Sequence, residues 1–192
     1  MESSWQILVS LAAGLGLAAA CGFRVFVPLL ALSAATRAQL LTVSDEMAWL
    51  GSTPALVCLG VATVLEVGAY YIPVVDNLLD SIATPASALA GAIVASSVVT
   101  DIDPALRWTL VAIAGAGVAT AIQLPSVLIR GTSTVSTAGV GNPVVSTGEA
   151  AGATATSALA IFAPILVPIF LVLVIWASWY LLGRRRRAEA PC

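Results

Sequence analysis

The sequence predicts an all-α, polytopic helical membrane protein with about five transmembrane helices plus broken or re-entrant segments. Of its 192 residues, 59% are hydrophobic and only 9% are charged, whereas soluble domains carry about 25% charged residues. The apolar runs are continuous rather than alternating, which favours helices over a β-barrel. We therefore expect a single transmembrane domain over residues 1–183, followed by a basic tail over residues 184–192.

Composition also excludes several classes of function. The formal net charge is −2, which argues against nucleic acid as a partner. The chain has no histidine, so it lacks the commonest zinc and haem ligand and the usual general base. Its cysteines are isolated, and the sequence contains no GxSxG, P-loop or HExxH motif. We expect neither an enzyme nor a cofactor, and no motif identifies a metal.

The first apolar segment, residues 5–35, is too long for one straight helix. It is interrupted at Cys21-Gly22 and at Pro28, and Arg24 lies just after the first interruption. The next segment, residues 54–72, begins with Pro54 after a Ser or Thr that suits an N-cap. A third segment covers residues 74–99.

The second half of the chain begins with an N-cap signal, Asp103-Pro104, and an apolar segment that ends near Gln123. Residues 124–148 are too polar to face lipid. Residues 149–182 would form a helix of about 51 Å, which exceeds the hydrocarbon thickness of about 30 Å. The sequence therefore predicts a small-residue helix over 149–163 and a separate span over 164–182.

Charge and aromatic residues predict the orientation. Positive residues near a span mark the cytoplasmic side, so Arg184–Arg187 place the C-terminus in the cytoplasm. Trp176, Trp179 and Tyr180 lie where an interfacial aromatic belt is expected. Counting back through five spans places the N-terminus outside and Arg37 and Arg107 at the cytoplasmic face. A re-entrant or split first segment would reverse the N-terminus.

Intramembrane carboxylates give the strongest functional signal, because charged side chains in hydrocarbon are expensive and are usually functional. Glu66 and Asp80 lie on either side of the tight turn expected at residues 71–73, each about 9 Å from it. They should therefore lie at similar depth on neighbouring helices. The third segment carries one polar face, made of Asp76, Asn77, Asp80, Ser81 and Thr84. This face continues as a small-residue seam suited to close helix packing, made of Ser87, Gly91 and Ala95.

Three interpretations of these carboxylates stay open. Carboxylate, amide and hydroxyl oxygens suit a hard cation such as Na⁺, Mg²⁺ or Ca²⁺. Neighbouring carboxylates also suit proton transfer, since each disfavours ionisation of the other. Alternatively, Arg24 or Arg130 neutralises Glu66 or Asp80 in a structural ion pair. Arg24 itself is either such a partner or, beside the free backbone N–H groups near Gly22, an anion ligand.

A second candidate site is the polar stretch Gly131–Gly148. Thr132 and Thr134 offer hydroxyls and the Gly139–Gly141 turn offers carbonyls, which are the groups that build selectivity filters. Irregular backbone at membrane depth is tolerated where it lines a cavity or is buried in protein. The alternative is an ordinary external loop.

Three stretches of the chain carry a resemblance to a known family: GLAAACGFRVFVPLLALSAATR, PALVCLGVATVLEVGAYYIPVVDNLLDSIATP and GTSTVSTAGVGNPVVS. They resemble a bacterial membrane family known as domain of unknown function 4126. The YYIPVVDNLLDSIATP block is its most distinctive part. The resemblance implies a bacterial inner-membrane protein and carries over no catalytic residue.

Together these features predict an ion channel or transporter for a small inorganic ion. Its site would be formed by the intramembrane carboxylates and a re-entrant Ser/Thr/Gly-rich loop. Because five short spans enclose little space, we expect a homo-oligomer. The alternative is a non-transporting scaffold or accessory subunit whose buried charges are structural ion pairs. A membrane enzyme comes third.

Overall fold

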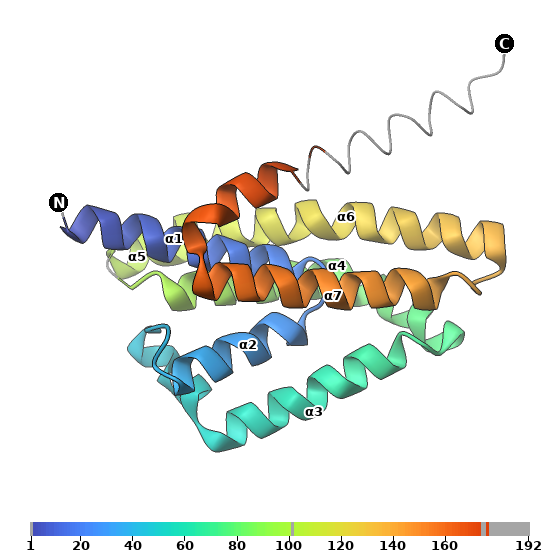
Figure 1. Cartoon of the computed structure of the whole chain (residues 1–192), viewed down its shortest axis with the longest axis horizontal. Coiled ribbons are helices and arrows are strands. Elements are labelled where there is room, and N and C mark those ends of the chain that lie inside the picture. The colour runs from blue at the N-terminus through green and yellow to red at the C-terminus, as the bar shows by residue number, and fades with distance from the viewer. Residues whose placement is uncertain (1, 101, 174–175, 177–192) are drawn as a thin grey trace, which may run out of the picture.

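A computed structural model describes residues 2–100, 102–173 and 176, and all regular elements within them are helices. The predicted basic tail and the belt residues Trp179 and Tyr180 lie outside this part. Figure 1 shows the arrangement of the elements. In chain order these are α1 (Glu2–Cys21), α2 (Phe26–Arg37), η1 (Asp45–Gly51), α3 (Thr53–Ala69), α4 (Pro73–Val98), α5 (Pro104–Leu106), η2 (Arg107–Val111), α6 (Ala112–Thr137), α7 (Asn142–Phe162) and η3 (Pro164–Leu166).

The all-α membrane architecture is confirmed, and the described residues hold fewer candidate spans than the five predicted. Three described helical stretches are long and apolar enough to cross a membrane: Ser4–Cys21, Leu78–Val98 and Pro104–Thr137. A fourth span results if η1 and α3, which meet at 70°, count as one. The break expected before Pro164 is present, because α7 ends at Phe162. Of the span predicted over 164–182, only residues 164–173 and 176 are described.

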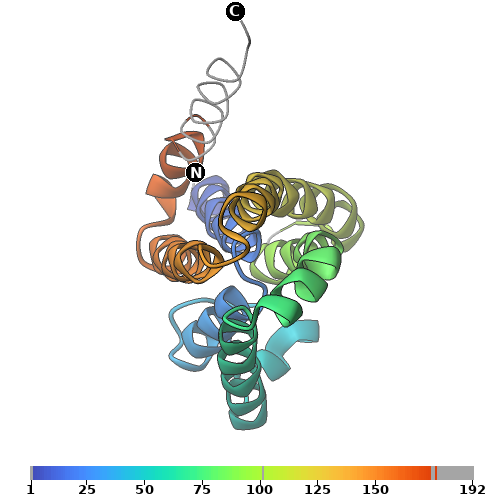
Figure 2. The same ribbon diagram turned by 90° about the vertical axis from the view of Figure 1, so that its right-hand side faces the viewer.

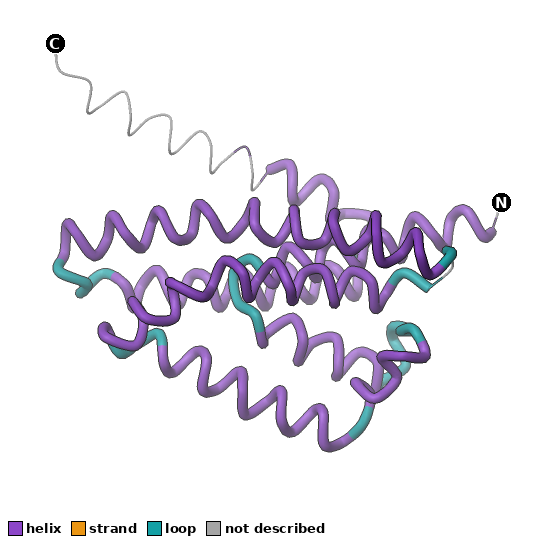
Figure 3. Tube along the Cα trace, turned by 180° about the vertical axis from the view of Figure 1, so that it is seen from behind, coloured by secondary structure: helices purple, strands orange, loops and turns teal. Residues whose placement is uncertain are grey.

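The first apolar segment is a helical hairpin rather than a single span. The chain leaves α1 at Cys21, and α2 runs back beside it (Figure 1). The link between them lies in the middle of the molecule, whereas the other loops lie at its two ends (Figure 3). Trp5 of α1 and Gln39, just after α2, line the same pocket. The prediction that the N-terminus and Arg37 lie on opposite faces is therefore wrong.

Gly22 explains why the hairpin turns where it does. A Cβ atom on Gly22 would lie 2.4 Å from the carbonyl oxygen of Ala119. The hairpin tip, residues 22–25 between α1 and α2, therefore packs directly on the backbone of α6. Pro28 is tolerated in the first turn of α2, where backbone N–H groups have no helical partner. The interruption predicted at Cys21-Gly22 is thus confirmed as a reversal of the chain, whereas Pro28 lies within α2 and does not interrupt it.

Small residues hold the central helices together. Gly91 of α4 and Gly115 of α6 face each other so closely that a Cβ atom on either would lie within 2.7 Å of the other's carbonyl oxygen. Gly14 of α1 packs against Ala95 of α4. The predicted seam through Ser87, Gly91 and Ala95 is therefore a helix contact surface. Figure 2 shows α1, α4, α6 and α7 grouped together, with α2 and α3 on one side of that group.

The polar stretch over residues 124–148 is mostly helical, which corrects the prediction of an irregular loop. α6 continues to Thr137 and α7 begins at Asn142. The turn between them uses two left-handed residues, Ala138 (φ 51°) and Gly139 (φ 84°). Hydroxyls do not break α6 because they donate to carbonyls one turn earlier, as Thr137 does to Ser133 at 2.7 Å.

Candidate functional site

The most unusual feature of the fold is a buried group of five charged side chains, here termed the charge cluster. It brings together four structural elements: the hairpin tip, α4, α6 and α7. Two arginines and two acids are almost fully buried, with residue exposures of 6% or less. The third acid, Asp80, is more open, with 18% of its side chain exposed. The members of the charge cluster are Arg24, Asp76, Asp80, Arg130 and Glu149.

Arg130 is the hub of the charge cluster. Its Nε donates to Glu149 Oε1 at 2.9 Å and its Nη2 donates to Glu149 Oε2, so the pair is bidentate. Its Nη1 donates to Asp76 Oδ1. The same nitrogen lies 3.7 Å from Asp80 Oδ1, which is an ion pair but not a hydrogen bond. Arg130 therefore links α6 to both α4 and α7.

Arg24 joins the hairpin tip to the charge cluster. Its Nη2 lies 3.1 Å from Glu149 Oε2 and donates to the Ser146 hydroxyl at 2.6 Å. Its Nε has no hydrogen-bond partner among the described residues. The ring of Tyr70 contacts both arginines, with its centroid 3.7 Å from Arg24 Cζ and 4.2 Å from Arg130 Cζ. Both cation–π contacts form in a desolvated setting, where such contacts are strongest.

Neighbouring polar groups complete the surroundings of the charge cluster. Asn142 Nδ2 donates to Asp76 Oδ2 at 2.6 Å and to the Thr134 hydroxyl at 3.0 Å. Ser126 donates to Glu149 Oε1. The carboxamide oxygen of Asn142 is buried and has no hydrogen-bond partner among the described residues. The network is thus close to satisfied, with a few polar atoms left over.

Five residues of the charge cluster and its surroundings were not predicted as site residues: Tyr70, Ser126, Asn142, Ser146 and Glu149. One signal was readable, because Asn142, Ser146 and Glu149 fall at i, i+4 and i+7 on one helix face. All three side chains are buried. Tyr70 had no such signal, since its role depends on which arginines approach it.

Glu66 is held by the hairpin tip and does not lie against α4 beside Asp80, as its predicted place on a neighbouring helix required. Its two carboxylate oxygens accept the backbone N–H groups of Val25 at 2.8 Å and Phe26 at 3.0 Å. A carboxylate suits the positive end of the α2 dipole. The arrangement differs from the predicted one because α3 packs mainly on α2 and η1 rather than on α4.

The other predicted residues differ in their surroundings, and one of them belongs to the network. Thr134 belongs to the network through Asn142. Ser81 and Thr132 are exposed and donate to carbonyls of their own helices, those of Leu78 and Leu128. Thr84 is half-buried, and its carbonyl accepts the Ser87 hydroxyl at 2.9 Å. Asn77 lies on α4, but its side chain is outside the described part of the structure.

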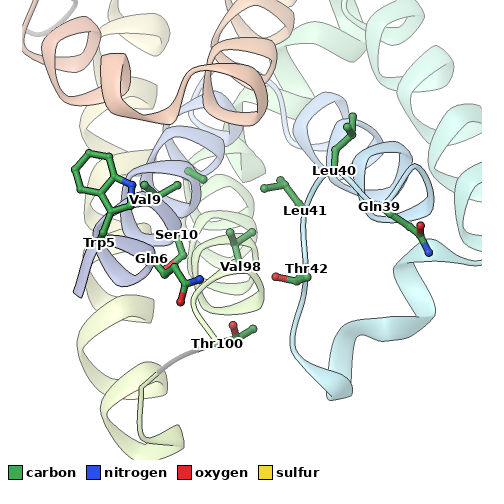
Figure 4. Close-up of a pocket in the computed structure, with 11 residues that line it drawn as sticks. Trp5, Gln6, Val9, Ser10, Gln39, Leu40, Leu41, Thr42, Val98 and Thr100 are labelled. Atoms are coloured by element: carbon green, nitrogen blue, oxygen red, sulfur yellow. The ribbon is translucent and has the colours of Figure 1, made fainter. Parts of the chain in front are cut away.

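Two hollows occur elsewhere in the molecule. A pocket of about 500 Å³ lies where α1 begins and α4 ends, and Gln6, Ser10, Thr42 and Thr100 contribute polar atoms to it (Figure 4). An apolar groove of about 550 Å³ lies between α2, α3 and α7. Neither is lined by a member of the charge cluster. Within the described residues, no group of three or more Cys, Asp or Glu side chains is arranged to hold a metal ion.

The fold and its site define a helical membrane protein with an ionic network inside the bundle. The chain belongs to the family described as domain of unknown function DUF4126, whose model matches residues 11–184. No curated protein and no solved structure matched the chain.

Proposed function

We propose that this protein transports protons across the inner membrane, with Asp80 as the group that takes up and releases the proton. The observation that carries the proposal is a charge imbalance. The charge cluster holds two arginines and three carboxylates, so that when fully ionised its net charge is 2 − 3 = −1. An uncompensated charge inside a membrane protein is expensive. One carboxylate must therefore hold a proton or meet a mobile cation.

Asp80 is the carboxylate best suited to this role. Asp76 and Glu149 both accept hydrogen bonds from Arg130, whereas Asp80 lies 3.7 Å from it. Asp80 Oδ1 has no hydrogen-bond partner among the described residues. Its side chain is 18% exposed, compared with 0% for Asp76 and 7% for Glu149. It is the most weakly held and most accessible acid of the charge cluster.

A proton fits this site better than a metal cation. The nearest charged neighbour of Asp80 is the guanidinium of Arg130, which repels a second cation. The described acids also do not gather into a metal-binding group. A proton on Asp80 removes the excess charge without needing a coordination shell.

Two further parts of the proposal concern context. We place the C-terminal tail in the cytoplasm because of Arg184–Arg187. We also propose a homo-oligomer, because one chain has few spans with which to enclose a pathway. The polar turn between α6 and α7 has no role in the pathway proposed here.

The second candidate is a structural scaffold in the membrane. It is favoured by the direct ion pairs of Arg24 and Arg130, which tie the hairpin tip to α7 and tie α6 to α4 and α7. Buried ionic networks of this kind can specify packing. In that case Asp80 is only a further partner of Arg130.

The test is proton flux into liposomes that contain the purified protein and a pH-sensitive dye, driven by a K⁺ diffusion potential. The proposal expects flux from the wild type and its loss in Asp80→Asn. The introduced carboxamide resembles a protonated aspartate, so thermal stability should stay close to that of the wild type. Ser81→Ala is the matched control, because Ser81 is exposed and its hydroxyl bonds within α4.

Two results would contradict the proposal. A wild type that passes no protons, combined with a destabilised Asp80→Asn protein, favours the scaffold. Flux of Na⁺ or K⁺ that does not acidify the vesicles, and that is lost in Asp80→Asn, would identify a metal cation rather than a proton as the transported ion. Chemical cross-linking in the same vesicles checks the homo-oligomer.

A further inference from the structure

The apolar groove between α2, α3 and α7 has the features of a lipid-binding site. Its volume of about 550 Å³ is in the range of small-molecule sites. Side chains from all three helices line it, and none of its described lining residues is charged. The larger apolar contributors are Val27, Leu30, Val67, Ile161 and Phe162.

Three residues of this lining carry hydroxyls, and Ser157 differs from Thr63 and Thr154 in its hydrogen bonding. Thr63 donates to the Leu59 carbonyl and Thr154 donates to the Ala150 carbonyl, each at 2.8 Å. Ser157 is 1% exposed, and its Oγ has no hydrogen-bond partner among the described residues. A buried hydroxyl without a partner is unfavourable. The groove therefore presents one unmet hydrogen-bonding group in an apolar wall.

We propose that the groove binds one acyl chain of a glycerophospholipid, and that Ser157 donates a hydrogen bond to an ester carbonyl of that lipid. The proposed bond needs the buried Ser157 Oγ to reach the groove that this residue lines, which requires a change of its χ1 rotamer. The acyl chain then covers the apolar lining.

The chemistry of the lining favours a phospholipid over other occupants. Its one unmet hydroxyl suits a neutral carbonyl acceptor, such as the ester group of a phospholipid, in an otherwise apolar wall. A free fatty acid would bring a carboxylate that no charged lining residue neutralises. This inference does not depend on proton transport.

The test is native mass spectrometry of the detergent-purified protein titrated with 1-palmitoyl-2-oleoyl phosphatidylglycerol. We expect the wild type to retain one lipid. Ala158→Trp should abolish retention, because Ala158 lines the groove and is exposed, so an indole there fills it. Ala155→Trp is the matched control, since Ala155 is exposed on the same helix outside the lining. Ser157→Ala should weaken binding by about fivefold, the effect of one hydrogen bond.

Three outcomes would overturn the proposal. The first is retention of the lipid by Ala158→Trp at the wild-type level. The second is a wild type that binds no lipid. The third is loss of a dimer, rather than of lipid, in Ala158→Trp, which would make a second copy of the chain the occupant. If thermal unfolding shows that Ala158→Trp is not folded, Ala34→Trp on α2 takes its place, because it fills the groove from the opposite wall.

Discussion

The two arginines of the charge cluster share the ring of Tyr70, yet they are held in different ways. Arg130 lies within the regular helix α6, and each of its three nitrogens donates to a carboxylate. Arg24 lies at a helix break, bonds one carboxylate and one serine, and has an Nε without a partner among the described residues. The hairpin tip is fixed instead by Gly22 on α6 and by Glu66 at the start of α2. Ion pairing thus dominates at Arg130, and backbone packing dominates at Arg24.

The largest expected effect is that of Arg130→Gln. This change leaves Asp76 and Glu149 buried with much of their neutralising charge removed. Breaking a buried ion pair by removing one partner lowers the free energy of unfolding by about 3–5 kcal/mol. Denaturation from mild detergent into SDS measures the loss, with the exposed Arg37→Gln as control. A loss below about 1 kcal/mol would contradict the role of Arg130 as the hub.

Arg24→Gln should have a smaller effect, because Glu149 keeps both hydrogen bonds from Arg130. The lost contacts are one ion pair, the hydrogen bonds to Ser146 and the cation–π contact with Tyr70. We expect the free energy of unfolding to fall by about 1–3 kcal/mol in the same assay. If Arg24→Gln is as destabilising as Arg130→Gln, the contrast between the two arginines is wrong.

Gly22→Ala tests whether packing fixes the hairpin tip. The added Cβ would meet backbone oxygen at 2.4 Å, and overpacking of this kind costs about 1–3 kcal/mol of stability. Gly117→Ala is the matched control, since a Cβ there meets open space in the middle of α6. That control should be neutral or stabilising by up to about 1 kcal/mol. Equal thermal stabilities for the two variants would show that the tip has room to shift.

The smallest expected effect is that of Tyr70→Leu. It removes two cation–π contacts while keeping an apolar side chain, and such contacts contribute about 0.5–2 kcal/mol. Tyr70→Phe keeps the ring and should stay near the wild-type melting temperature. A large loss in Tyr70→Phe would mean that the phenol hydroxyl, and not the ring, is what stabilises the pair.

Much of the site could be predicted as a set of residues, but not as a set of contacts. The polar face of α4 includes Asp76 and Asp80, and both belong to the charge cluster. The predicted place of Glu66 beside α4 was wrong, because its carboxylate accepts hydrogen bonds from the hairpin tip instead. Thr132 carries the same hydroxyl as Thr134, but Thr132 bonds within α6 whereas Thr134 reaches Asn142. Residue type does not distinguish the two.

The sequence by itself determined the helical membrane class, the breaks at Gly22 and before Pro164, and the cap at Asp103, which the structure shows as side-chain hydrogen bonds. It left the cap of α3 open between Ser52 and Thr53, and the structure shows Ser52. These features follow from composition and from local rules that act over a few residues. Only the tertiary structure decided that the first segment turns back, and which acids neutralise Arg24 and Arg130. Those pairings join residues 19, 54 and 125 positions apart. The choice among them depends on which helices pack together, and that is a long-range property that no local pattern encodes.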